Sequence, residues 1–118
     1  MKNTFRQNFG KEGENKAWEF LKNKKYELLE MNFRHKKSEI DLIVKNRDTL
    51  VFCEVKTRST FDFGFPETFV SAKQKEKIQL GAEYYIQKIF WEGKIRFDIL
   101  SVELKDNELI VTHFEDAF

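Results

Sequence analysis

The chain has 118 residues, of which 41% are hydrophobic and 35% are charged, and its net charge is +1. These values predict one globular domain over residues 1–118, large enough to bury a core without disulfides. The single cysteine, Cys53, excludes an internal disulfide and favours a reducing compartment, so we expect a cytoplasmic protein. No apolar stretch approaches the length of a membrane span or a signal-peptide core, and neither export nor membrane insertion is predicted.

A first helix is predicted from about Asn8 to Asn23. Its inward stripe consists of Ala17, Trp18 and Leu21. Glu14 lies on the same stripe, so its carboxylate is predicted to point inward; the alternative is an ordinary first-turn acid that favours the helix dipole. Gly10 and Gly13 lower the helix propensity but allow another element to approach closely.

A strand is expected from Tyr26 to Phe33, followed by a basic loop from Arg34 to Ser38. The next two apolar stretches, 39–45 and 50–57, are rich in β-branched and aromatic residues. Turn-prone residues from Asn46 to Thr49 separate them, and the pattern therefore predicts a β-hairpin.

The register of this hairpin follows from its pattern, because a loop of two residues and a loop of four give the same pairing. Both place Asp41 opposite Glu54. One face is then wholly apolar and consists of Ile40, Leu42, Val44, Val51, Cys53 and Val55. The other face carries Asp41, Ile43, Phe52, Glu54 and Lys56.

Two facing carboxylates need a cation, because opposed residues on one face have Cβ atoms about 5 Å apart and like charges so placed are destabilising. A divalent metal bound by both would satisfy them, and Lys56 could then direct its ammonium group at the reacting oxygens of a substrate. The alternative is a set of solvated charges, with Glu39 opposite Lys56 as a surface ion pair. Because Ile43 and Phe52 share this face, the edge of a site fits better than open solvent.

The loop from Arg58 to Pro66 contains three phenylalanines. Their rings are expected to enter the core, and the alternative is stacking on unpaired bases. A second helix follows, with Ser71 and Gln74 at capping-box spacing. Its apolar stripe consists of Ile78, Ala82, Tyr85, Ile86 and Ile89. Two strands, 94–104 and 109–114, joined by a turn at Asp106-Asn107, complete an αβββαββ order.

Basic residues cluster in four short stretches: 22–25, 34–37, 56–58 and 73–77. Two of the clusters flank the hairpin, which indicates one basic face for nucleic acid, although each cluster alone is also typical of solvated helix ends and loops. The residues expected to contact nucleic acid are Arg34, Lys36, Lys37, Arg58 and Lys73. Of the two histidines, His35 is expected to contact phosphate and His113 to be structural.

Several fragments together resemble a known family. They are Gly13-Glu14-x-x-Ala17, Glu39-Ile40-Asp41-Leu42-Ile43, Phe52-Cys53-Glu54-Val55-Lys56-Thr57-Arg58, Phe63-Gly64-x-Pro66, Arg96-Phe97-Asp98 and Ala117-Phe118. Their order and spacing resemble the YraN-like family and, more broadly, the restriction-endonuclease-like nucleases that carry the PD-(D/E)xK motif. The sequence departs from these patterns at Ile40, where many nucleases have proline, and at Ser38, where the family often has glycine.

The resemblance implies an α/β fold with a restriction-endonuclease-like, Holliday-junction-resolvase-like core, in which a mixed central sheet is flanked by helices. It places Glu14, Asp41, Glu54 and Lys56 where that nuclease class has its catalytic acids and lysine. Neither departure removes a ligand.

We therefore predict a Mg²⁺- or Mn²⁺-dependent endonuclease that hydrolyses phosphodiester bonds in DNA, with branched or structured DNA as a candidate substrate. Hard cations prefer carboxylate oxygens, so Asp41, Glu54 and Glu14 are the expected metal ligands, assisted by the Val55 carbonyl. Lys56 would orient the nucleophile or neutralise the pentavalent phosphate. Branched DNA would require a homodimer, because two strands must be cut.

Two other functions remain open. The chain could be a non-catalytic nucleic-acid-binding module that uses the same basic face, in which case its affinity would fall steeply with salt and be indifferent to loss of Asp41. It could also be a protein-interaction subunit that uses the phenylalanine-rich loop and the C-terminus.

Overall fold

The computed structural model describes residues 4–58 and 70–118, with side chains from residue 9 onward. The described residues form seven helices and strands in the predicted αβββαββ order. They are α1 (Thr4–Asn23), β1 (Glu27–His35), β2 (Ser38–Asn46), β3 (Thr49–Arg58), α2 (Ala72–Lys88), β4 (Lys94–Lys105) and β5 (Glu108–Phe114).

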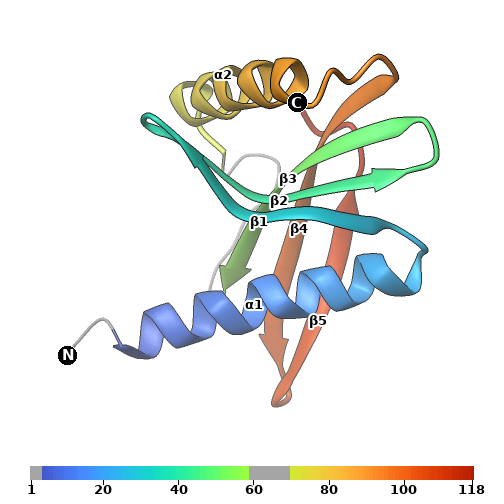
Figure 1. Cartoon of the computed structure of the whole chain (residues 1–118). Coiled ribbons are helices and arrows are strands. Elements are labelled where there is room, and N and C mark those ends of the chain that lie inside the picture. The colour runs from blue at the N-terminus through green and yellow to red at the C-terminus, as the bar shows by residue number, and fades with distance from the viewer. Residues whose placement is uncertain (1–3, 59–69) are drawn as a thin grey trace.

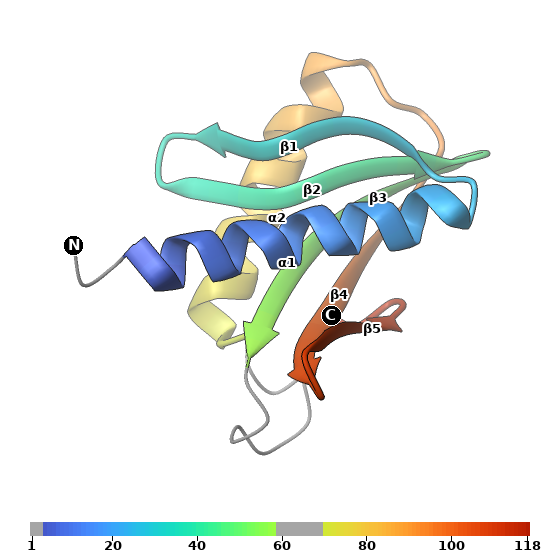
Figure 2. The same ribbon diagram turned by 90° about the horizontal axis from the view of Figure 1, so that it is seen from below.

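The five strands form one mixed sheet in the order β1-β2-β3-β4-β5. β3 and β4 are parallel, and the other neighbours are antiparallel. α2 lies in the crossover between the two parallel strands, as the connection of such a pair requires. Figures 1 and 2 show α1 across one face of the sheet and α2 on the other. The predicted α/β class is confirmed, and the architecture is compatible with a restriction-endonuclease-like core.

The hairpin of β2 and β3 has the predicted register. Leu42 pairs with Cys53, and Asn46 pairs with Thr49 across a two-residue turn. Arg47, in this turn, has a positive φ of 57°. These pairs lead toward Asp41 and Glu54, which are the next positions along the two strands. The local pattern therefore sets which residues meet at this end of the hairpin.

Each face of the sheet has its own core. The α1 side is built around Ala17, Leu21, Leu42, Val44, Val51, Cys53, Val55, Leu100 and Val102. The α2 side is built around Phe33, Ile40, Ile43, Leu50, Phe52, Ile78, Ala82, Tyr85 and Ile99. The thiol of Cys53 is thus buried and free, and burial raises its pKa well above the ordinary value.

The prediction for Ile40 was wrong. Ile40 packs in the α2-side core with Ile43, not on the α1 side with Leu42. The regular alternation of sides is interrupted around Asp41, where the ladder between β2 and β3 ends and the Asp41 side chain, rather than a backbone carbonyl, accepts the hydrogen bond of the Val55 N–H.

Several predicted boundaries also differ. α1 begins at Thr4 rather than near Asn8. β1 continues to His35, because the residues expected in a basic loop pair with the start of β2. The connection is reduced to Lys36-Lys37, where Lys36 has a positive φ of 56°. The phenylalanine-rich loop lies outside the described residues, apart from Arg58.

Gly13, but not Gly10, permits a close approach. A Cβ at Gly13 would overlap the side-chain hydroxyl of Thr57 and lie 2.9 Å from its methyl group, so α1 contacts β3 at this point. At Gly10 an added Cβ would meet nothing within 4 Å, and that part of the prediction was wrong.

The predicted cap and stripe of the second helix are confirmed. Ser71 is the N-cap of α2, and its hydroxyl accepts a hydrogen bond from the Gln74 N–H at 3.1 Å. Ile78, Ala82 and Tyr85 are buried against the sheet. None of the helices within the described ranges is long and apolar enough to span a membrane.

Candidate functional site

A cavity of about 240 Å³ lies at the open end of the β2–β3 hairpin, near the start of β2 and the end of β3, beside the first turns of α2. It is lined by Lys37, Glu39, Asp41, Glu54, Gln74, Lys77 and Ile78. The two carboxylates that the hairpin pattern predicted to face each other therefore open into one hollow. Lysines from the β1–β2 turn and from α2 stand at its walls.

Asp41 and Glu54 share a hydrogen bond between their carboxyl groups. Burial, reinforced by the charge of Glu54, raises the pKa of Asp41 to about 8. The pKa of Glu54 is also raised by burial, although the nearby Lys56 ammonium opposes this shift. Glu54 is only 6% exposed. The pair therefore retains a proton at neutral pH unless a cation replaces it.

One carboxylate oxygen of Glu54 is held by two other side chains. The ammonium nitrogen of Lys56 lies 3.4 Å from Glu54 Oε2. The side-chain amide of Gln74 donates a hydrogen bond to the same oxygen. Because Ser71 caps the first turn of α2, the position of Gln74 depends on the start of that helix.

The alternative of a surface ion pair between Glu39 and Lys56 is not what the structure contains. Glu39 pairs with Arg34 instead, at 3.3 Å. Lys56 faces Glu54, whose side chain is 7% exposed. The lysine is thus part of the carboxylate cluster rather than a solvated partner.

Glu14 reaches the neighbourhood of this cluster from α1. Its pKa is raised by burial and next by the charge of Asp41, while a hydrogen bond with the side chain of Asn32 lowers it. Among the residues that the structure describes, no three His, Cys, Asp or Glu side chains are close enough to hold one metal ion. Glu14 therefore does not join Asp41 and Glu54 in one ligand cluster, and its role as a metal ligand stays a prediction.

The five residues predicted to contact nucleic acid do not all lie at the cavity. Lys37 lines it, and Lys36 lies beside it on the border of a larger groove. Arg34 pairs with Glu39, and Arg58 pairs with Glu103 at 3.6 Å. Lys73 is exposed on the first turn of α2. Lys77, which the prediction omitted, lines both the cavity and the groove.

A third buried acid, Asp98, was not singled out by its chemistry in the sequence. It is 0% exposed and accepts hydrogen bonds from Arg96, from His113 at 2.7 Å and from the Asp116 N–H at 3.0 Å. Burial alone would raise its pKa, but these hydrogen bonds lower it below the ordinary value. The sequence could have indicated a buried acid here, because Asp98 is a single acid within an apolar stretch. Both carboxylate oxygens of Asp98 already accept hydrogen bonds within the protein, so its role is structural. The structural role predicted for His113 is confirmed.

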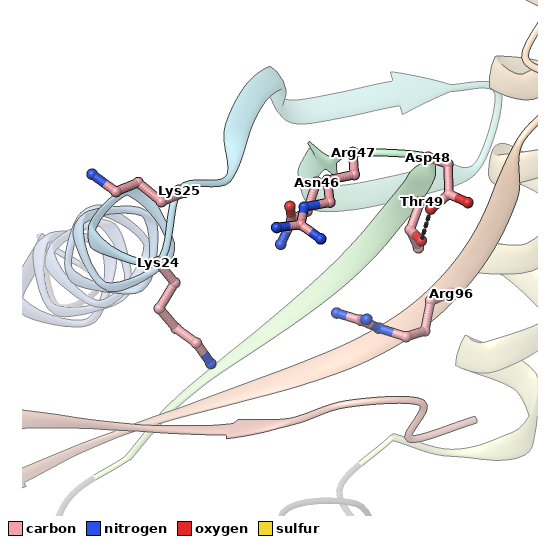
Figure 3. A pocket seen from close by; sticks show the side chains of 7 residues that line it. All are labelled: Lys24, Lys25, Asn46, Arg47, Asp48, Thr49 and Arg96. Atoms are coloured by element: carbon pink, nitrogen blue, oxygen red, sulfur yellow. Dashed lines mark hydrogen bonds between the residues drawn. The ribbon is translucent and has the colours of Figure 1, made fainter.

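A second pocket, of about 350 Å³, lies at the opposite end of the hairpin (Figure 3). Lys24, Arg47 and Arg96 approach it from the end of α1, the β2–β3 turn and β4. Asp48 is the one acid among its described lining residues. Arg96 is already paired with Asp98 and Glu115. This pocket lacks the paired carboxylates of the first cavity.

Comparison with known proteins gives one consistent result. The family model of "Uncharacterised protein family UPF0102" matches residues 13–102. A UPF0102 protein of Christiangramia forsetii is 40% identical over 109 residues, and one of Flavobacterium psychrophilum is 41% identical over 109 residues; each alignment covers 92% of both chains. A UPF0102 protein of Cytophaga hutchinsonii is 46% identical over 90 residues, which cover 76% of this chain and 80% of the relative. The matched span contains the cavity and its charged residues.

Proposed function

We propose that this chain, which belongs to the UPF0102 family and thus to the YraN-like proteins that its motifs resemble, is a metal-dependent endonuclease that hydrolyses phosphodiester bonds in DNA. One observation carries the proposal. A buried pair of carboxyl groups, Asp41 and Glu54, lies in a cavity with Lys56 beside it and lysines at its walls.

The donors of this pair fit a hard divalent cation. Two buried carboxyl groups that share a proton offer oxygen ligands to a cation that displaces it. Mg²⁺ prefers such oxygens and keeps several waters, so one or two carboxylates suffice. Asp41 and Glu54 would hold the ion, with the Val55 carbonyl as a further oxygen, and Glu14 is the third candidate ligand. When bound, Mg²⁺ or Mn²⁺ supplies the Lewis acidity for phosphodiester hydrolysis.

The chain's own residues would supply position and charge. Lys56 places a positive charge next to Glu54, where it would offset the charge that develops on the phosphate. Gln74 fixes the orientation of the Glu54 carboxylate through a hydrogen bond, as supporting residues of metal ligands do. Lys37 and Lys77 at the cavity would attract the phosphates of the strand.

The test is cleavage of labelled single-stranded, duplex, flap and four-way-junction DNA with Mg²⁺ or Mn²⁺. Wild type is compared with Asp41→Asn and Lys56→Met. Asp106→Asn and Lys105→Met make the same chemical changes at exposed positions and serve as matched controls. We expect metal-dependent cutting that is lost in both site variants and kept in both controls.

Binding of the same DNA is measured alongside, without metal. Asp41→Asn should keep its affinity for DNA, because the carboxylates are placed to bind a cation rather than phosphate. Binding by the wild type without cutting of any substrate would overturn the proposal in favour of a nucleic-acid-binding module. Cutting that survives Asp41→Asn would place the chemistry elsewhere.

A further inference from the structure

A second and larger hollow adjoins the candidate site. This groove, of about 700 Å³, lies between the β1–β2 turn and α2. Figure 1 shows the tip of that hairpin beside the helix. Lys37 and Lys77 line both the groove and the cavity of Asp41 and Glu54. A polymer with one unit in the cavity would therefore meet the groove with its next units.

The groove is bordered by a preformed aromatic stack. The rings of His35 and Tyr84 are 3.5 Å apart between centroids and differ in orientation by only 7°. Phe33 supports Tyr84 from a ring centroid 6.2 Å away, with an interplanar angle of 22°. The rings are thus held parallel by the fold, before any ligand arrives.

This aromatic surface is accessible rather than part of the core. Tyr84 is 39% exposed and Leu80, one turn before it on α2, is 57% exposed. Its charge is positive, since Lys36, Lys37 and Lys77 border the groove and Glu83 is the one acid among its described lining residues. Flat rings beside cations match the two parts of a nucleotide, which are its base and its phosphate.

We propose that this groove, which we call the stacking groove, holds unpaired bases of the DNA strand whose phosphate enters the Asp41–Glu54 cavity. The proposal rests on the proposed nuclease function and narrows its substrate to DNA with unpaired nucleotides next to the cleaved bond. The reason is geometric. A paired base in a duplex is stacked on its neighbours, so it has no free face to add to the His35–Tyr84 stack, whereas an unpaired base does.

The experiment measures DNA binding without metal, so that it does not depend on catalysis. The affinity of the protein for a labelled single strand and for a blunt duplex is determined by fluorescence anisotropy in EDTA. We expect Tyr84→Ala to weaken single-strand binding about fivefold or more, the loss expected for one stacked base, and to leave duplex binding unchanged. Tyr84→Phe keeps the ring and should bind like wild type.

Two matched variants control for the loss of an exposed side chain. Phe90→Ala removes an aromatic residue that is 87% exposed and lies outside the groove. Gln79→Ala changes an exposed position next to Leu80 on α2. Both should bind single strands like wild type. In a second measurement, a single strand carrying 2-aminopurine should be quenched by wild type and Tyr84→Phe but not by Tyr84→Ala.

Four outcomes would overturn the proposal. In the first, Tyr84→Ala binds a single strand as tightly as wild type does, and in the second, it loses affinity equally for single strand and duplex. In the third, the protein binds an RNA strand of the same sequence more tightly than the DNA strand. In the fourth, Tyr84→Ala changes the oligomeric state, which would assign the groove to a second copy of this chain. Failure of the nuclease function looks different. It would appear as absent cleavage while the single-strand preference and its dependence on Tyr84 persist.

Discussion

The Oδ2 atom of Asp41 accepts a hydrogen bond from the backbone N–H of Val55 at 2.7 Å. A side chain of β2 thus takes the place that a backbone carbonyl would have in a continuing ladder, and the regular backbone pairing of the two strands ends at Leu42 and Cys53. The regular pairing thus ends next to the two carboxylates. The site is therefore built into the end of the hairpin, and changes to Asp41 should affect both stability and chemistry.

We expect Asp41→Asn to stabilise the metal-free protein at alkaline pH. The folded-state pKa of Asp41 is raised to about 8 from an ordinary value of 3.8, so the folded state holds a proton that the unfolded state has lost. This contribution to stability is full below about 3.8 and is lost as the pH rises through about 8. Asparagine keeps an oxygen for the Val55 N–H and carries no charge.

The check is urea denaturation of Asp41→Asn and wild type in EDTA at pH 6 and pH 9. The gain of the variant at the higher pH should be at least about 1.4 kcal/mol, the free energy of one pKa unit. Asp106→Asn, in the exposed β4–β5 turn, should show no such gain. A variant less stable than wild type at both values would contradict the burial-raised pKa of Asp41.

The affinity for Mg²⁺ or Mn²⁺ should rise with pH. Below about 8 the ion must displace the proton that Asp41 holds, so each pH unit should improve the apparent affinity by up to about tenfold, with a plateau above that value. Titration calorimetry at pH 7 in two buffers of different ionisation enthalpy measures the proton released. Affinity that is flat between pH 6 and pH 8 would mean that the pair does not bind the ion.

Gln74→Ala should weaken metal binding and cleavage without unfolding the protein. The amide of Gln74 holds Glu54 Oε2, and loss of such a supporting contact typically costs about 10- to 100-fold in affinity or activity. Gln79→Ala on the same helix is the matched control, because it makes the same change at an exposed position. A normal cleavage rate in Gln74→Ala would show that Lys56 alone suffices to position Glu54.

Gly13→Ala should destabilise the protein by about 1–3 kcal/mol, the range for an overpacked contact. The new methyl group would overlap the side chain of Thr57 and push α1, with Glu14, away from β3. Thermal unfolding should show that Thr57→Ala in the same chain restores part of the loss, as expected for residues in contact. Gly10→Ala is the control and should be neutral or stabilising, since nothing lies within 4 Å of its added Cβ.

Asp98→Ala should be among the most damaging single changes for stability. It would leave Arg96 and His113 without their buried partner, and breaking such a pair costs about 3–5 kcal/mol. Because the pKa of Asp98 is lowered from 3.8, its stabilisation is present above that value and is lost as the pH falls through the lower folded-state pKa. Denaturation between pH 2 and pH 7 checks this, with exposed Glu108→Ala as the control.

The sequence by itself determined the local features of the fold, namely strand register and the start of a helix. The alternation along β2 and β3 and the short turn at Arg47-Asp48 set the register that brings Asp41 toward Glu54, because strand pairing depends on neighbours in the chain. Local pattern also located the capped start of α2 at Ser71. The end of β1 was misjudged, since basic residues join a strand when a partner strand pairs with them.

Only the tertiary structure decided how distant elements meet at the site. Gln74 reaches Glu54 and Glu14 approaches Asp41 because α2 and α1 dock on opposite faces of the sheet. The stack of His35 on Tyr84 likewise joins segments far apart in the chain. Side-chain periodicity states which face of an element is apolar but not which residue of another element it will meet. That choice depends on the depth and angle at which each helix packs, and therefore on the whole core.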